Sequence, residues 1–168
     1  MIDGVGADLD SLGHALSRIE LDSDSMIEDL RWDYTRLFIG PFKLPCPPWE
    51  SVYRSQARLL MQDAADDVRR VYAAVGLSVE ATGMMPDHVG VELHFLALLS
   101  ETADSNDDPH SEIARLKQAF LNDHLLQWIP QFAADMEAAA ETDFYRALAR
   151  VTVEALTRLG GTGGAAPI

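Results

Sequence analysis

Apolar residues recur at helical spacing along most of this 168-residue chain, and this period constrains the fold more than any other feature. A first helix is predicted from about Ser25, whose spacing to Glu28 is that of a capping box, up to Gly40 and Pro41. Further helical segments are predicted from about Ser51, from Asp63 to Gly76, from Pro86 through a buried run at Val89–Leu99, from Asp108 and Pro109, across Leu125–Ala140 with a break at Pro130, and from about Thr142 to Leu159. No strand pair or internal repeat stands out. The sequence therefore predicts one all-α domain, a helical bundle over residues 1–159, with a disordered glycine-rich tail at 160–168.

Four prolines between residues 41 and 48 exclude a regular helix there and predict a stiff, extended loop. Trp49 follows this loop directly, and Tyr53 lies one helical turn later. Tyr34 and Phe38 have the same four-residue spacing on the preceding predicted helix. Aromatic side chains spaced in this way can act as rigid anchors on one helix face, although the same spacing is also typical of a packed core.

The net charge of −14 argues against binding to nucleic acid or to an anionic membrane surface, because both depend on lysine and arginine. The same charge favours a partner that carries positive charge. Acidity that only maintains solubility, or a halophilic adaptation, is the alternative explanation. The chain starts without a secretory signal pattern and has no apolar stretch long enough to span a bilayer, so a cytoplasmic protein is expected.

Catalytic motifs are absent from the sequence. It has no nucleophile elbow, no phosphate-binding glycine loop and no dinucleotide fingerprint, so we predict neither an enzyme nor a cofactor. Cys46 is the only cysteine, which excludes an intramolecular disulfide and a cysteine zinc cluster. Since only Lys43 is a nearby basic residue, a reactive thiol is not expected.

Three blocks of sequence carry more specific information. They are DYTRLFIGP at 33–41 leading into PPWESVY at 47–53, DHVGVELHF at 87–95, and FLNDHLLQWIP at 120–130 followed by DFYRAL at 143–148. In this order and spacing, within one acidic helical chain, they resemble the TorD/DmsD family of redox-enzyme maturation chaperones, which is related to the nitrate reductase chaperone NarJ. The resemblance extends from about Leu30 to Leu159.

The resemblance implies an all-helical fold and a binding role without catalysis. Members of the family bind the twin-arginine signal peptide or the apo form of a molybdopterin oxidoreductase, assist cofactor insertion and delay export. The positions that match the family's binding surface are Tyr34, Phe38, Trp49, Tyr53, Asp87 and His88. A non-enzymatic helical scaffold that binds a different partner is the alternative function.

Two departures from the family pattern bear on this expectation. The chain begins closer to the Tyr34 block than is usual, so either its start is misassigned or another contact, such as a homodimer, covers the exposed core. In addition, Met84 and Met85 stand where relatives often carry acidic residues, which affects the specificity for the client.

The residues around the second block also have physical interpretations of their own. Asp87 can pair with an arginine of the signal peptide, and His88 can make binding sensitive to pH. Alternatively, Asp87 only complements the N-terminus of a helix and His88 is a satisfied polar group. Glu92 is expected to be a polar residue of the core, held by a hydrogen bond or ion pair, with Arg36 as the suggested partner.

Histidine positions allow one further hypothesis. His88 and Glu92 are four residues apart, so a metal-dependent hydrolase that uses them with His124 is conceivable, but no HExxH motif supports a metal site. His94 faces away from His88. For His124 and Trp128 we expect packing against the final helix, through Phe144, Tyr145 and Leu148.

Overall fold

The computed structural model describes residues 10, 13, 14, 17, 23–41, 43–55, 60, 63–79, 83–104, 108 and 110–161 of the chain. Within these ranges every regular secondary-structure element is a helix, and the single β-bridge is isolated. The predicted all-α class is therefore confirmed. The chain groups into two compact units. The first comprises Met1–Pro47 with Pro130–Arg158, and the second Pro48–Ile129 with Leu159–Ile168. The single domain over residues 1–159 stays a prediction.

In the first unit, α2 (Ser23–Tyr34) continues into a π-helical turn, η1 (Thr35–Ile39), and ends at Gly40. Gly40 has a φ of 94°, a conformation that glycine adopts without strain, so the predicted end of this helix is confirmed. The predicted start is wrong, because α2 begins at Ser23 and Ser25 therefore lies inside the helix instead of capping it.

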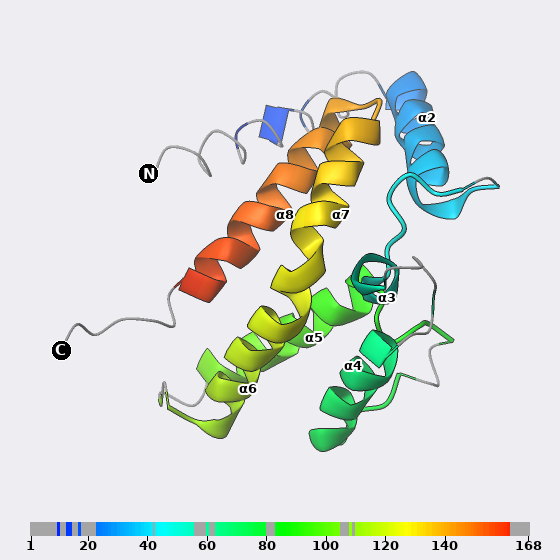
Figure 1. Cartoon of the computed structure of the whole chain (residues 1–168). Coiled ribbons are helices and arrows are strands. Elements are labelled where there is room, and N and C mark those ends of the chain that lie inside the picture. The colour runs from blue at the N-terminus through cyan, green and yellow to red at the C-terminus, as the bar shows by residue number, and fades with distance from the viewer. Residues whose placement is uncertain are drawn as a thin grey trace. The chain divides into compact units, whose positions relative to one another are not determined.

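A helical hairpin completes the first unit (Figure 1). It is formed by α7 (Leu126–Ala139), from Pro130 onward, and by α8 (Asp143–Gly161) up to Arg158. The buried apolar side chains of this unit come from these helices, the turn between them, η1 and the loop after it: Leu37, Cys46, Phe132, Ala133, Met136, Ala140, Ala147, Ala149 and Leu156. The last helix ends at Gly161, two residues later than expected. The rest of the predicted tail, residues 162–168, lies outside the described residues.

Pro130 does not break its helix, contrary to prediction, because α7 runs through it from Leu126 to Ala139. Proline lacks the N–H group that would bond to the carbonyl one turn earlier. The backbone just before α7 forms a second π-helical turn, η3 (Leu121–Leu125), so the regular hydrogen-bond pattern already changes there. The proline falls in the turn that follows this irregularity, where the lost hydrogen bond is tolerated.

The second unit contains α3 (Glu50–Arg54), α4 (Asp63–Ala74), α5 (Val89–Asp104), α6 (Glu112–Phe120), η3 and the start of α7. Its core includes an aromatic group in which the Phe95 ring centroid lies 4.6 Å from that of Tyr72 and 4.8 Å from that of Phe120. The other buried apolar side chains of this unit are Val52, Ala64, Ala65, Val68, Leu96, Leu99, Leu121, Leu125, Trp128 and Ile129.

Several predicted boundaries in this unit need correction. Pro86 and Asp87 precede α5 and do not form its first turn. The next helix begins at Glu112, capped by Ser111, whose Oγ accepts a hydrogen bond from the Ala114 N–H at 3.2 Å, so it does not start at Asp108. Although α5 is nearly all apolar, Leu98 is exposed, so one side of it is not buried as expected.

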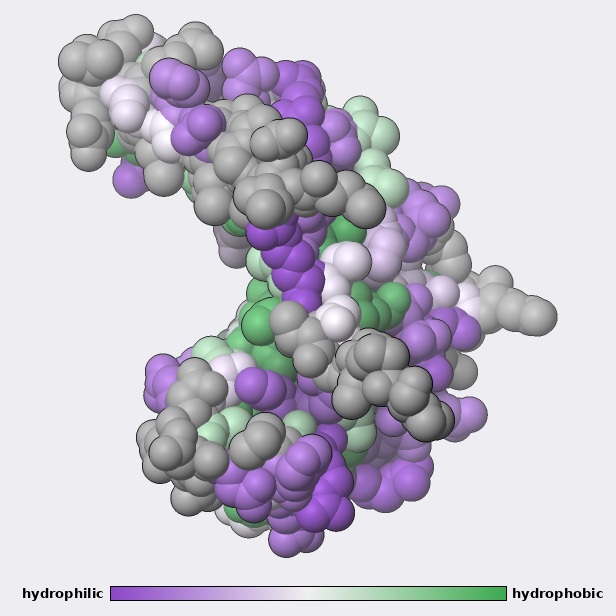
Figure 2. All heavy atoms as spheres, turned by 90° about the vertical axis from the view of Figure 1, so that its left-hand side faces the viewer, coloured by the Kyte–Doolittle hydropathy of each residue, from purple (hydrophilic) through white to green (hydrophobic). Residues whose placement is uncertain are grey.

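On the face drawn in Figure 2, hydrophilic side chains occupy much of the coloured surface, in keeping with the net charge of −14. Among the helices that the structure describes, none has both the length and the apolar character needed to cross a membrane.

Candidate functional site

A short antiparallel pairing joins the end of the proline loop to the residues before α5. Trp49 and His88 form an isolated β-bridge, in which the Glu50 N–H donates to the Asp87 carbonyl at 3.0 Å and the Val89 N–H donates to the Pro48 carbonyl at 2.9 Å. The pairing requires an extended backbone, which Trp49 provides with φ −132° and ψ 131°. Three of the predicted site residues, Trp49, Asp87 and His88, are therefore held together by backbone hydrogen bonds.

The Trp49 and His88 rings form the accessible part of this pairing. Their centroids lie 6.0 Å apart with the planes at 75°, an edge-to-face arrangement, and both side chains are half-buried. Burial lowers the pKa of His88, although the neighbouring Asp87 charge acts in the opposite direction. The Gly90 N–H donates to Nδ1 of His88 at 3.0 Å, which requires that nitrogen to be unprotonated. The lowered pKa and this hydrogen bond both favour the neutral imidazole with its proton on Nε2.

Asp87 has a different role from the one its sequence position suggested. Its side chain is fully buried, and Oδ2 accepts a hydrogen bond from the Ser51 N–H at 3.0 Å. Trp49, which occupies the N-cap position of α3, provides no side-chain cap, so Asp87 caps this helix from another part of the chain. An ion pair with an arginine of a ligand needs an exposed carboxylate, and the geometry instead makes Asp87 a residue that positions α3.

Glu50, which sequence analysis did not single out, holds the other side of α3. Its carboxylate is fully buried, accepts a hydrogen bond from Arg54 at 2.7 Å, and lies 3.1 and 3.2 Å from Nδ1 of His124. Arg54 also donates to the Asp123 carbonyl at 3.0 Å. These bonds fasten α3 to η3. The signal for this role was the spacing of Glu50 and Arg54, four residues apart.

Glu92 is a buried polar residue, as expected, but its suggested partner was wrong. Its Oε2 accepts a hydrogen bond from the Trp128 indole N–H at 3.0 Å. Arg36 instead pairs with Asp33 at 2.7 Å and with Glu141 at 3.2 Å, all within the first unit. Burial, followed by the nearby Glu50 charge, raises the pKa of Glu92 well above its usual range. The protonated carboxyl group is therefore favoured.

Tyr53 and the two aromatic residues of the first helix complete the predicted set. The half-buried Tyr53 ring lies 5.5 Å from that of the fully buried Trp128. In the first unit, Phe38 packs against Tyr34 at 5.4 Å, Tyr145 at 5.8 Å and Phe132 at 6.2 Å, and Tyr34 is 47% exposed. Tyr34 and Phe38 thus form one group and Trp49, Asp87 and His88 another, with Tyr53 one turn along α3 from Trp49.

The histidines do not assemble into a metal site. Within the described ranges, no three histidine, cysteine, aspartate or glutamate side chains form a group suited to a metal ion. His124 bonds to Glu50, Glu92 to Trp128 and His88 to the Gly90 N–H, so the three residues of the hydrolase hypothesis have separate partners. The packing of His124 and Trp128 against the final helix stays a prediction.

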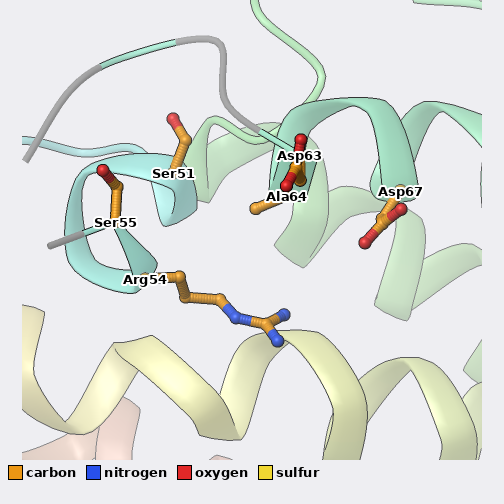
Figure 3. Close-up of a pocket in the computed structure, with 6 residues that line it drawn as sticks. All are labelled: Ser51, Arg54, Ser55, Asp63, Ala64 and Asp67. Carbon is orange, nitrogen blue, oxygen red and sulfur yellow. The ribbon is translucent and has the colours of Figure 1, made fainter. Parts of the chain in front are cut away.

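A small pocket lies between α3 and α4 (Figure 3). Its volume is about 250 Å³, and it is lined by Ser51, Arg54, Ser55, Asp63, Ala64 and Asp67. Sequence analysis did not find it, because α3 and α4 are separate helices whose approach depends on tertiary packing.

Comparisons with known proteins identify a family. A sequence profile of the family described as nitrate reductase delta subunit matches residues 2–134. A protein named chaperone protein TorD, from Vibrio parahaemolyticus, is 30% identical over 148 residues, which cover 86% of this chain and 68% of that protein. The probable Tat proofreading chaperone DmsD of Haemophilus influenzae is 31% identical over 130 residues, with 77% and 59% covered. A chaperone protein TorD of Vibrio cholerae is 33% identical over 147 residues, with 84% and 65% covered.

Proposed function

This chain belongs to the TorD/DmsD family of redox-enzyme maturation chaperones, and from that premise we propose that it binds the twin-arginine signal peptide, the apo form, or both, of a molybdopterin oxidoreductase. In this role it assists insertion of the cofactor into its client and delays export. It works in the cytoplasm and performs no chemistry itself. The ligand it recognises is a peptide that combines a pair of arginines with an apolar run.

The Trp49–His88 pair is the observation that carries the proposal. Two half-buried rings stand on backbone that is fixed by the β-bridge, so little conformational entropy is lost when a ligand binds to them. A guanidinium group stacks well on aromatic faces, and an uncharged His88 does not repel it. The net charge of −14 speeds the encounter with a cationic peptide.

Each of the six predicted residues has a proposed part in this function. Trp49 and His88 contact the peptide directly, and Tyr53 extends the aromatic surface along α3. Asp87 acts through α3 by capping its first turn. Tyr34, which is 47% exposed, contributes contacts for the apolar run, with Phe38 supporting its ring.

Isothermal titration calorimetry with a twin-arginine signal peptide tests this proposal, with a twin-lysine peptide as the control ligand. We expect micromolar or tighter binding that is lost with lysine, and a loss of about tenfold or more in affinity for Trp49→Ala, since aromatic anchors dominate such interfaces. Trp32→Ala is the matched control variant, because Trp32 is 66% exposed and lies outside the predicted site. Equal losses in the two tryptophan variants, with both proteins folded by circular dichroism, would show that the site is misassigned.

A scaffold function with a different partner, or with a second copy of this chain, is favoured by one observation. Trp32 and Ile39, seven residues apart on α2 and η1, are 66% and 63% exposed, which is unusual for large apolar side chains. Sedimentation velocity separates the two functions. A stable dimer that Trp32→Ala dissociates, together with no heat from either peptide, would replace the signal-peptide proposal with the scaffold.

A further inference from the structure

The short helix α3 carries the Trp49 and Tyr53 rings but cannot hold its own position. It has five residues, and its N-cap position provides no side-chain hydrogen bond. An isolated helix of this length is not stable in water, so contacts with the rest of the second unit must fix it. Besides the Asp87 cap, the buried Glu50 carboxylate and the buried Trp128 ring provide such contacts.

Both of these buried groups contact Glu92 of α5. The Trp128 indole N–H donates to Oε2 of Glu92 at 3.0 Å, while the Trp128 ring lies against that of Tyr53, with the centroids 5.5 Å apart. Burial raises the pKa of Glu92 most, and the charge of Glu50 and a side-chain hydrogen bond between the two acids raise it further. The two carboxyl groups therefore face each other in the core of the second unit.

A hydrogen bond between two carboxyl groups requires a proton on one of them, because an ionised carboxylate only accepts. Oε1 of Glu92 is buried, and no hydrogen-bond donor in the described part of the chain reaches it. The Glu50 carboxylate, in contrast, accepts from Arg54 at 2.7 Å and lies 3.1 Å from Nδ1 of His124. The negative charge thus belongs on Glu50 and the proton on Oε1 of Glu92.

We propose that Glu50 positions the aromatic surface of α3 by means of a proton that it shares with Glu92. Glu50 is then bonded to Arg54 of its own helix, to His124 of η3 and, through the proton, to α5. The last of these bonds exists only while Glu92 is protonated, so the position of α3 depends on pH. That this position serves peptide binding rests on the proposed function, whereas the shared proton does not.

The neighbouring groups cannot compensate a second negative charge at this place. Ionisable neighbours of the pair come from four segments of the described structure: Arg54 of α3, Tyr72 of α4, Asp87 before α5 and His124 of η3. Arg54 and His124 already bond to Glu50, and Asp87 is itself an acid. The Tyr72 hydroxyl donates to the Pro86 carbonyl at 2.9 Å. An ionised Glu92 therefore repels Glu50 and loosens α3.

Peptide binding should accordingly weaken as the pH rises. The shared proton is present below the raised pKa of Glu92 and is lost as the pH passes through that value. We expect the affinity for an N-acetylated twin-arginine peptide to fall about tenfold from about pH 7 to about pH 9.5, which corresponds to about one pKa unit between the bound and the free protein. His88 does not contribute, because its lowered pKa keeps it neutral over this range.

Glu92→Gln tests whether the proton is the cause of this pH dependence. The glutamine amide can donate to Glu50 at every pH while its carbonyl accepts from Trp128, so the ratio of the two affinities should approach one. Glu101→Gln, at an exposed position of α5, is the matched control and should keep the tenfold ratio. A Glu92→Gln protein whose affinity falls with pH as in wild type would overturn the proposal.

Carbon-13 NMR of the glutamate carboxyl groups detects the shared proton without any ligand. In wild type, the Glu50 and Glu92 signals should shift with one common midpoint, and the amide signal of Ser51 in α3 should shift with them. Glu50→Gln should lower the midpoint of Glu92, because the charge beside it is lost. An unchanged midpoint in this variant, whose spectrum also reports whether it is folded, would show that the two acids share no proton.

The outcomes of the two tests separate the inference from the proposed function. If the peptide binds wild type equally well at both pH values, positioning by the shared proton is wrong and the chaperone function stands. If no peptide binds, but the Glu50, Glu92 and Ser51 signals shift together and Glu50→Gln lowers the midpoint, the function is wrong and the shared proton stands. If no peptide binds and the signals shift independently, both are wrong.

Discussion

Asp33→Ala should destabilise the first unit strongly, because one buried carboxylate caps the turn between α7 and α8. Oδ2 of Asp33 accepts hydrogen bonds from the Glu141 N–H at 3.0 Å, the Thr142 N–H at 2.8 Å and the Thr142 hydroxyl at 2.8 Å. Oδ1 accepts a hydrogen bond from Arg36 at 2.7 Å. Asp33 is fully buried and belongs to α2, so it holds the two residues that precede α8 from a different helix.

The expected loss is about 3 kcal/mol of unfolding free energy. A donor left unpaired in a buried place costs about 1–3 kcal/mol. Breaking a buried ion pair completely costs about 3–5 kcal/mol. The Asp33 variant should stay below the upper end of that range, because Arg36 keeps its contacts with Glu141 and the Ala139 carbonyl, and water can reach the exposed Glu141.

Urea denaturation followed by circular dichroism measures this loss. Asp29→Ala, at an exposed position of the same helix, is the control and should change stability by less than about 0.5 kcal/mol. Asp33→Asn should be intermediate, since its carbonyl oxygen can still accept from the Thr142 N–H but its amide group is directed at Arg36.

A double-mutant cycle decides whether the capping geometry is the cause. Thr142→Val removes one of the donors to Asp33 and should cost about 1 kcal/mol in the wild-type background. In the Asp33→Ala background the same change should cost almost nothing, because its partner is already absent. Additive losses, or a loss below about 1 kcal/mol for Asp33→Ala alone, would refute the capping role.

Two further predictions follow from buried titratable groups. The pKa of Glu92 is raised in the folded state, well above the value of 4.5 in the unfolded chain. The stability that comes from its bound proton is therefore complete below pH 4.5 and is lost as the pH rises through the pKa of the folded state. Glu92→Gln, whose carbonyl can still accept from Trp128, should therefore gain stability relative to wild type from pH 5 to 8 in urea titrations, and parallel curves would contradict this. Burial raises the pKa of Cys46 to about 12, so a thiol reagent at pH 8 should modify it only after denaturation; rapid reaction of the folded protein would show that the thiol is accessible.

Helix ends were predictable where the local backbone determines them. Gly40 and Gly76 have φ values of 94° and 76°, and both end helices as the sequence indicated. Pro130 was misjudged because the π-helical turn before it depends on how η3 packs, which no local pattern reveals. Ser111 was missed as a cap because Asp108 and Pro109, three residues earlier, gave the stronger local signal.

The structure explains why three of the predicted site residues lie together, whereas their part in binding stays a proposal. The resemblance to a family pointed to Trp49, Asp87 and His88, and the structure gives the physical reason for their proximity, a β-bridge between segments almost 40 residues apart in sequence. Burial is a tertiary property, so the sequence could not show that Asp87 caps α3 from within the core. For the same reason the partner of Glu92 was assigned to Arg36 when a tryptophan supplies the hydrogen bond.

The acidic residues of this protein are of two kinds, buried and exposed, and the two kinds have different effects. Asp33, Glu50, Asp87 and Glu92 are fully buried in the described structure, and each accepts a hydrogen bond from a group on another segment, so their charge or proton serves the fold. Neither solubility nor steering of a cationic partner explains these four residues, because both effects act through exposed carboxylates. A loss of peptide binding in Asp87→Ala would therefore report a displaced α3 as readily as a lost contact. Substitution of a half-buried group that a ligand can reach, such as the Trp49 ring, gives the more direct measure of what the site recognises.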